Sequence, residues 1–342
     1  MKEFTVSAAE SGQKCIKYCE KLLPNAGTGF LYKMLRKKNI TLNGKKADGN
    51  ERLSAGDVLR FFFSDDTFLL FSERESQKNT SVKPATNIPV LDANKIIYED
   101  EHVLLYNKPV GVLSQKSKPQ DVSVNEMFLA YLQKTKAKSG VFSEEKTADA
   151  ISRPSVCNRL DRNTSGLILC GKTYLGLRVM NTMLAERSVG KYYHCLVAGC
   201  INKPILLKGY LKKDEKTNKV TVRQEMFDGA SYIETEITPL KSSDAVSLLE
   251  VHLITGKTHQ IRSHLAHLGH PILGDHKYGN PGINEQYRRK YGLKHQLLHA
   301  YRLEFPDLET ELTYLSRKQF VAQKPALFSK IEKEELCGNV EF

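Results

Sequence analysis

Two segments near the start of the chain carry apolar residues at helical spacing. Residues 13–23 and 28–38 are separated by Pro24-Asn25-Ala26-Gly27, a combination that ends a helix. Apolar residues spaced three or four positions apart are expected on the buried face of a helix. In the first segment these residues are Cys15, Ile16, Cys19, Leu22 and Leu23, and in the second they are Phe30, Leu31, Met34 and Leu35. The opposite side of the second segment carries Lys33, Arg36 and Lys37, so we predict a helix with a basic exposed face.

The pattern then changes to that of strands and a linker. Residues 40–42 predict a strand, which is followed by Asn43-Gly44, a strong signal for a hairpin turn, and residues 57–63 predict another strand. Residues 64–95 have mixed charge, a polar run and two prolines, which is typical of a linker. From residue 96 the pattern is mostly that of strands, with helices predicted near 174–187 and 258–268. We therefore predict an α+β protein with a small domain at 13–63, a linker at 64–95 and a larger domain at 96–325.

The charge distribution indicates a polyanionic partner. The net charge is +12, and residues 1–63 hold half of this excess in less than a fifth of the chain. No apolar run approaches the ~20 residues that span a bilayer, and the start lacks the apolar core of a secretion signal. Seven cysteines, without framework spacing, predict reduced thiols. We expect a cytoplasmic protein with no membrane segment.

Asp161 is the strongest candidate for a chemical role. It lies between Arg159 and Arg162 in the segment Asn-Arg-Leu-Asp-Arg-Asn-Thr-Ser-Gly, directly before the apolar run 167–170. Neighbouring positive charge favours the ionised carboxylate, which suits a nucleophile or a general base, and the arginines suit a phosphate-rich ligand. A salt-bridged loop is the alternative, although two arginines with one carboxylate leave positive charge that a ligand anion could balance.

Three further segments could contribute to a site. Residues 107–111 (Asn-Lys-Pro-Val-Gly) end a strand and contain Lys108, and residues 191–199 place Tyr192 and Tyr193 on opposite faces of a strand, where one could stack on a base. Residues 253–275 contain Gly-Lys-Thr and several histidines. A phosphate loop would need glycine at position 251, which is valine, and the histidines lack the spacing of a zinc site. The sequence thus predicts no nucleotide cofactor, no metal and no other cofactor.

The order and spacing of these segments resemble those of the RluA-type RNA pseudouridine synthases. The resemblance covers about 96–310 and rests on "NKPVGVLSQ", "NRLDRNTSGLIL", "KYYHCLVAG" and "LITGKTHQIRSHLAHLGHPILGD". It implies a mixed, largely antiparallel β-sheet catalytic domain with flanking helices and a central cleft. It further implies that Asp161 is catalytic, that Arg262 pairs with it, that Tyr193 packs against the target base, and that Arg159 fills the space left by a flipped nucleotide. We also assign Lys108 to RNA contact.

The N-terminal segment resembles an S4 RNA-binding domain. The basic helix followed by "LNGK" and "LSAGDVLRF" carries this resemblance, which implies that Lys33, Arg36, Lys37 and Lys38 contact RNA phosphates. One residue departs from the family pattern, since Asn158 stands where the catalytic motif usually has histidine. An asparagine can still hold the loop by hydrogen bonds, so we expect the activity to persist.

The resemblance implies conversion of uridine to pseudouridine in RNA, with 23S rRNA or a ribosome assembly intermediate as the expected partner. A non-catalytic RNA-binding or ribosome-assembly protein is one alternative, and a nucleoside hydrolase or glycosidase is another. The hydrolase is disfavoured because such enzymes usually place two carboxylates around the bond, and these segments offer Asp161 alone. A monomer is the default expectation. The uridine modified, the route taken by Asp161 and the role of Arg162 stay open.

Overall fold

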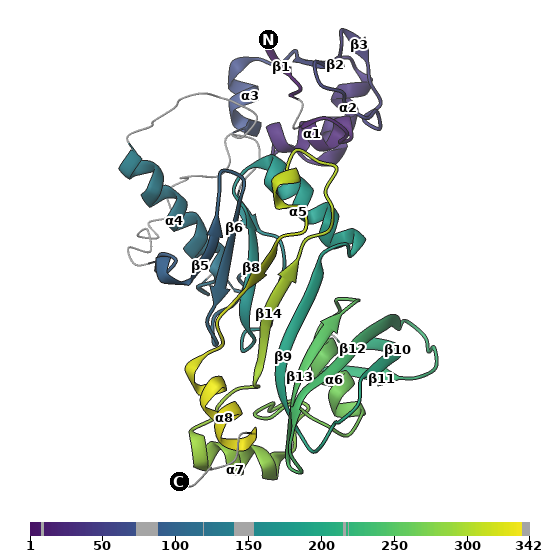
Figure 1. Ribbon diagram of the computed structural model, residues 1–342. Helices are drawn as coiled ribbons and strands as arrows, with labels where there is room; N and C mark the ends of the chain where they lie inside the picture. Colours follow the sequence, from purple (N-terminus) through teal and green to yellow (C-terminus); the bar gives the residue numbers. More distant parts are fainter. Residues whose placement is uncertain are drawn as a thin grey trace. The chain divides into compact units, whose positions relative to one another are not determined.

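The computed structural model describes residues 1–7, 10–72, 88–118, 120–139, 154–214, 217 and 219–336 (Figure 1). The contacts divide the chain into two compact units. One comprises residues 1–88 with 134–154 and 172–176, and the other comprises 89–133, 155–171 and 177–342. No helix in the described ranges is long and apolar enough to cross a membrane.

The smaller unit is a four-stranded antiparallel sheet with helices. The sheet has the order β1-β4-β2-β3. Its elements are β1 (Lys2–Thr5), α1 (Cys15–Leu22), α2 (Thr28–Arg36), β2 (Ile40–Leu42), β3 (Lys45–Lys46), β4 (Val58–Phe61) and α3 (Asp65–Ser72). The two predicted helices are confirmed, as is the hairpin, in which Asn43 and Gly44 both adopt positive φ.

The smaller unit extends beyond the predicted boundaries of 13 and 63. Strand β1 pairs with β4, and α3 forms where a linker was expected. Phe68 of α3 is buried and stacks on Phe4 at 5.7 Å and against Phe61 at 5.8 Å between ring centroids. These aromatic contacts explain the correction, because an isolated short apolar run does not reveal which core it joins. Residues 73–87 of the predicted linker lie outside the described residues.

The larger unit is built on one mixed sheet. Within the described residues it has eleven strands, with the main order β11-β10-β12-β13-β9-β14-β8-β6-β5, while β15 pairs with β14 and β7 with β8. The β14–β8 pair is parallel and the others are antiparallel. The strands are β5 (Ile96–Glu99), β6 (Val103–Lys108), β7 (Ser155–Val156), β8 (Ser165–Gly171), β9 (Gly190–Ala198), β10 (Ile205–Asp214), β11 (Lys219–Arg223), β12 (Ser231–Ser242), β13 (Val246–Leu253), β14 (Leu298–Glu304) and β15 (Gln319–Val321).

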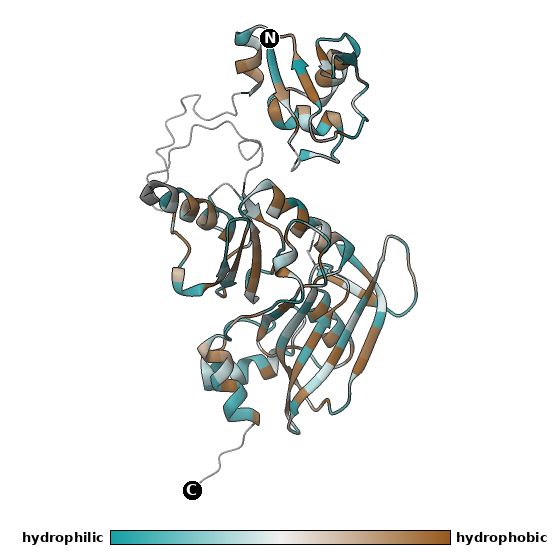
Figure 2. Ribbon diagram, turned by 45° about the horizontal axis from the view of Figure 1, so that its top comes forward, coloured by the Kyte–Doolittle hydropathy of each residue, from teal (hydrophilic) through white to brown (hydrophobic). Residues whose placement is uncertain are grey.

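Helices cover both faces of this sheet. The α-helices are α4 (Val124–Ser139), α5 (Tyr174–Glu186), α6 (Gln260–His267), α7 (Pro281–Tyr291) and α8 (Ala326–Leu336), with short 3-10 turns η2 (Ala93–Lys95) and η4 (Thr313–Leu315). One apolar core joins α4 and α6 to one sheet face, and a second core joins α7 and α8 to the opposite face. Figure 2 shows hydrophobic and hydrophilic residues alternating along the long outer strands, which agrees with the alternating burial of β12.

Strand β8 lies inside this sheet and carries the candidate loop at its start. All seven of its residues are buried, which explains the continuous apolar run that follows Asp161. Gly166 has a φ of 109°, and a Cβ atom there would lie 2.2 Å from the carbonyl oxygen of Ala300 on β14. The close parallel pairing of these two strands therefore requires glycine at this position.

Candidate active site

A cleft of about 1000 Å³ opens in the larger unit. Its walls come from residues 113–117, from the loop 157–164 before β8, from Lys191 and Tyr193 of β9, and from residues 256–262 at the start of α6. Three of the four segments singled out in the sequence therefore meet in one cavity. Asp161 and Arg262, for example, are 101 residues apart in the chain. The fourth, at 107–111, is hydrogen-bonded to the loop that carries Asp161, because Lys108 and the amide of Gly111 both donate to the carbonyl of Arg162.

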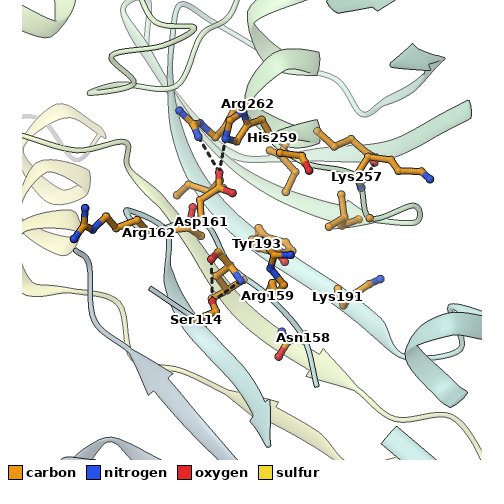
Figure 3. A pocket seen from close by; sticks show the side chains of 18 of the residues that line it. Ser114, Asn158, Arg159, Asp161, Arg162, Lys191, Tyr193, Lys257, His259 and Arg262 are labelled. Atoms are coloured by element: carbon orange, nitrogen blue, oxygen red, sulfur yellow. Dashed lines mark hydrogen bonds and ion pairs between the residues drawn. The ribbon is translucent and has the colours of Figure 1, made fainter. Parts of the chain in front are cut away.

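Asp161 is held in the cleft by Arg262. The Nη1 atom of Arg262 donates to Oδ2 of Asp161 at 2.8 Å, as the family resemblance implied (Figure 3). The other edge of the guanidinium forms a two-pronged bond with Asp275, from Nε to Oδ2 at 2.7 Å and from Nη2 to Oδ1 at 2.9 Å. Arg262 is thus fixed on both sides, and it orients Asp161 by a charge-assisted hydrogen bond.

Asp275 is the residue that the sequence reasoning missed. Its carboxylate is 1% exposed and also accepts the backbone N–H groups of Lys277 and Tyr278. Burial alone would raise the pKa of Asp275, but the hydrogen bonds and charge of Arg262, with these two amides, hold that pKa below its usual range. Its place in "HPILGD", thirteen residues after Arg262, was the available signal. Asp275 is not free to act as a second carboxylate at the bond to be broken.

Asp275 and Asp161 also set the charge state of Arg262. Burial alone would lower the pKa of Arg262, but the hydrogen bond and charge of Asp275, followed by those of Asp161, raise that pKa above its ordinary value. Arg262 is therefore a permanent cation beside Asp161.

The choice between Tyr192 and Tyr193 is settled by the orientation of β9. Tyr193 is 8% exposed and lines the cleft, whereas Tyr192 points to the other face and stacks on His252 at 4.6 Å between ring centroids. Burial, and then the charge of Asp161, raise the pKa of Tyr193 above its usual value, so the phenol is neutral. Tyr193 therefore presents a neutral aromatic ring in the wall of the cleft.

Side-chain hydrogen bonds hold the loop before β8. Asn158 donates from Nδ2 to the carbonyl of Leu167 at 3.2 Å and accepts from the amide of Leu169 at 2.8 Å. Ser114 both donates to the carbonyl and accepts from the amide of Leu160, at 2.9 Å each. Asn158 thus pins the loop to the strand without the histidine of the family pattern, as we expected.

Lys108 is buried and bonded within the protein, which corrects the prediction that it is available to contact RNA. Its side chain is fully buried, and Nζ donates to the backbone carbonyls of Pro109 at 3.1 Å, Val112 at 2.8 Å and Arg162 at 3.0 Å. Burial lowers the pKa of Lys108 to about 7, and the charge of Asp161 opposes that effect. Lys108 therefore ties the turn after β6 to the loop that carries Asp161.

We predict that Lys108→Met lowers both stability and turnover. It leaves carbonyl groups without their donor, at a cost of about 1–3 kcal/mol in the free energy of unfolding. The loop carrying Asp161 loses its tether, so the rate should also fall, by about tenfold for a modest misplacement. Urea unfolding and a single-turnover assay measure the two effects. Lys118→Met, at an exposed lysine, is the matched control and should change neither; equal effects in both variants would contradict the tethering role.

The Gly-Lys-Thr sequence forms a loop organised by Gln260. Gln260 is buried and accepts from the hydroxyl of Thr255 at 2.9 Å and the amide of Lys257 at 3.0 Å. Burial lowers the pKa of His264 to about 4, and its Nδ1 lies 3.0 Å from the hydroxyl of Thr235. Among the residues that the structure describes, no group of three or more His, Cys, Asp or Glu side chains could hold a metal ion.

Several cations line the cleft. Four of them form no ion pair within the described part of the chain, namely Arg159, Arg187, Lys191 and Lys257. Burial, and then the charge of Arg187, lower the pKa of Lys191, which indicates that the two cations are close. Arg162 is exposed and donates from Nε to the carbonyl of Gly111 at 3.1 Å, so this contact supports the loop. The cleft therefore combines one anchored carboxylate with uncompensated positive charge, as expected of an enzyme acting on a polyanion.

Comparisons with known proteins identify this class. Residues 102–267 match the family model for RNA pseudouridylate synthase. The chain is 32% identical over 328 residues to an uncharacterised RNA pseudouridine synthase of Mycoplasma genitalium, covering 93% of this chain and 94% of that protein. The chain belongs to the RNA pseudouridine synthases of the RluA type, and it is accordingly an isomerase that acts on RNA.

Other relatives carry more specific names. The ribosomal large subunit pseudouridine synthase D of Borreliella burgdorferi is 32% identical over 269 residues, covering 78% of this chain and 74% of that protein. The ribosomal large subunit pseudouridine synthase C of Vibrio cholerae is 28% identical over 304 residues, covering 86% and 85%. The solved structure of human RNA pseudouridylate synthase domain containing 4 has the same fold, with a TM-score of 0.53, 20% identity, and coverage of 70% of this chain and 92% of that chain.

Proposed function

We propose that this enzyme converts uridines of large-subunit ribosomal RNA to pseudouridine, with Asp161 as the catalytic carboxylate. The observation that carries the proposal is the placement of Asp161 in the cleft, hydrogen-bonded to a cation that is itself fixed by Asp275. The names of the relatives from Borreliella burgdorferi and Vibrio cholerae favour the large-subunit RNA. Such a substrate would put the reaction in the cytoplasm.

The reaction requires that the target base leave its stack. The glycosidic bond must break and the base must turn and rejoin the sugar through C5, and a stacked base is out of reach of Asp161. Extrusion costs a few kcal/mol, which stacking on an aromatic ring can partly offset. Figure 3 shows Tyr193 and Arg159 beside Asp161 in the cleft, where they could hold the base and fill the space that it leaves.

The smaller unit supplies a separate grip on RNA in this proposal. Lys33, Arg36, Lys37 and Lys38 are exposed on and just after α2, while the apolar residues of that helix are buried in the core of the unit. We interpret the unit as an S4-like domain that contacts phosphates, which raises affinity without reading the base sequence.

The environment of Asp275, the other carboxylate near Arg262, argues against a glycosidase. Such an enzyme usually needs two carboxylates flanking the bond, and Asp275 faces Arg262 and backbone amides instead. The test is a product analysis with RNA carrying tritium at C5 of uridine. We expect tritium release with the base retained in the RNA as pseudouridine. Release of free uracil would indicate a hydrolase, and binding without either product would indicate a non-catalytic RNA-binding protein.

The RNA itself is identified by mapping. Pseudouridines in large-subunit rRNA from cells lacking this protein should disappear at specific positions and return when the gene is restored. Unchanged large-subunit rRNA together with tritium release from another RNA would contradict the proposed substrate, and it would leave the isomerase activity intact.

We predict that the cations of the cleft contribute to RNA affinity by neutralising phosphates. The double variant Arg187→Gln/Lys191→Gln should reduce the salt dependence of binding, lowering the slope of log K against log salt by about 0.7 for each phosphate that is no longer neutralised. Filter binding at several salt concentrations measures the slope. Lys203→Gln is the matched control, since Lys203 is exposed and does not line the cleft. An unchanged slope in the double variant would place the RNA backbone elsewhere.

A further inference from the structure

We propose that His259 is a second catalytic residue, donating a hydrogen bond from Nε2–H to an oxygen of the target nucleotide bound beside Asp161. This inference rests on the proposed function, in which Asp161 acts on that nucleotide. His259 directly precedes α6 and lines the cleft, and Figure 3 shows it on the same side of Asp161 as Arg262.

The backbone of His259 is held in a conformation that few residues adopt. Its φ is 55°, in the left-handed region, although it is not a glycine. The surrounding loop enforces this conformation, because the amide of Lys257 donates to the side chain of Gln260 and the amide of Ser263 donates to the carbonyl of His259 at 2.9 Å. Such strain costs of order 1–3 kcal/mol and concentrates at functional sites. Here its effect is to direct the imidazole into the cleft.

A chain of hydrogen bonds assigns the proton of the imidazole. The backbone amide of Val220 donates to the phenol oxygen of Tyr278 at 3.0 Å, and that oxygen lies 2.9 Å from Nδ1 of His259. The phenol O–H has no other acceptor in the described part of the chain, so we assign it as the donor to Nδ1. The ring proton of a neutral His259 is then on Nε2, since the hydrogen bond at one nitrogen sets the tautomer at the other.

The Nε2 atom faces Asp161 without bonding to it. It lies 3.9 Å from Oδ2 of Asp161, beyond hydrogen-bond distance, and it donates no hydrogen bond within the described part of the chain. Burial, with the charges of Arg262 and Lys277, lowers the pKa of His259, although Asp161 and Asp275 act in the opposite direction. The side chain of His259 is 9% exposed, so its Nε2–H group lies at the wall of the cleft and can donate to a bound ligand.

The chemistry of the target nucleotide supplies the acceptor. A uridine bound against Asp161 carries carbonyl oxygens on its base and hydroxyl oxygens on its ribose. A preorganised N–H aimed at such an oxygen stabilises charge that develops as the glycosidic bond breaks, because no water must reorganise. Removing one such donor typically costs about 10²–10³ in rate.

Replacing His259 with asparagine or with glutamine distinguishes the role of Nε2 from that of Nδ1. His259→Asn tolerates the left-handed backbone and keeps an amide near the Nδ1 position, but does not reach the position of Nε2. His259→Gln reaches that position with its own N–H. We expect single-turnover tritium release to fall about 10²-fold in His259→Asn and His259→Ala, with recovery of about tenfold in His259→Gln. RNA affinity, measured by filter binding, should change less than twofold. His267→Ala, at an exposed histidine of the same helix, is the control and should keep the wild-type rate.

A further variant tests the tautomer without altering the imidazole. Tyr278→Phe removes the phenol hydrogen, so the ring proton can occupy either nitrogen, and we expect a severalfold fall in the single-turnover rate. Wild-type rates in His259→Asn would overturn the proposal, as would equal rates in the Asn and Gln variants. If His259→Asn is unaffected while Asp161→Asn is inactive in the same assay, only the role of His259 fails. Tritium release by Asp161→Asn within tenfold of the wild-type rate would instead contradict the part of the proposed function that makes Asp161 the catalytic carboxylate.

Discussion

Asp161→Asn is expected to abolish pseudouridine formation while leaving the fold and RNA binding unchanged. Asparagine has nearly the same shape as aspartate, and its amide oxygen can still accept the hydrogen bond from Nη1 of Arg262. It cannot act as a nucleophile or as a base, so turnover should fall by more than about 10⁴-fold, as when a catalytic group is removed as a whole. Tritium release from RNA labelled at uridine C5 measures the loss, and filter binding and circular dichroism check affinity and fold.

A second variant, which moves the carboxylate from position 161 to position 163, tests whether the loss of activity is specific to Asp161. Asn163 also lines the cleft, two residues after Asp161, so an acid there tests whether any carboxylate in the loop suffices. The double variant Asp161→Asn/Asn163→Asp should be as inactive as Asp161→Asn alone, because its carboxylate lacks the bond to Arg262. If the turnover of Asp161→Asn is within tenfold of the wild-type rate, Asp161 is not the catalytic carboxylate.

Replacing Arg262 should lower stability as well as activity. In Arg262→Met the buried carboxylate of Asp275 keeps only its backbone donors, and breaking a buried pair in this way costs about 3–5 kcal/mol in the free energy of unfolding. Asp161 loses its bond at the same time, so turnover should fall together with the urea midpoint. Arg262→Lys keeps the charge but not the planar fork that joins the two acids, so we expect low activity there too.

A double variant separates the two consequences. Arg262→Met/Asp275→Asn removes the uncompensated charge along with the arginine, and it should recover most of the stability that Arg262→Met forfeits. It should remain inactive, because Asp161 still lacks its partner. Recovery of turnover in the double variant would mean that Arg262 acts through stability alone. A destabilisation of less than about 1 kcal/mol in Arg262→Met would contradict the buried pair.

The periodicity and the turn chemistry of the chain determined much of the local structure. Apolar spacing predicted α1, α2 and α5, and Asn43-Gly44 predicted a hairpin, because these signals depend on neighbours within a few residues. The motif segments also named Asp161 and its family, since their order along the chain is itself a sequence property. Alternation along β9 left two tyrosines on opposite faces, and it could not say which face was the cleft.

Only the tertiary structure decided which groups line the cleft and which are buried against partners inside the protein. Lys108 reads as an exposed cation in a Pro/Gly turn, yet three carbonyls, one of them 54 residues away, surround it in the fold. Asp275 has no role assigned from the sequence, yet it holds the arginine that orients Asp161. Burial and charge pairing depend on residues far apart in the chain. A sequence therefore names the chemical groups, and only packing determines which of them are free to act on a ligand.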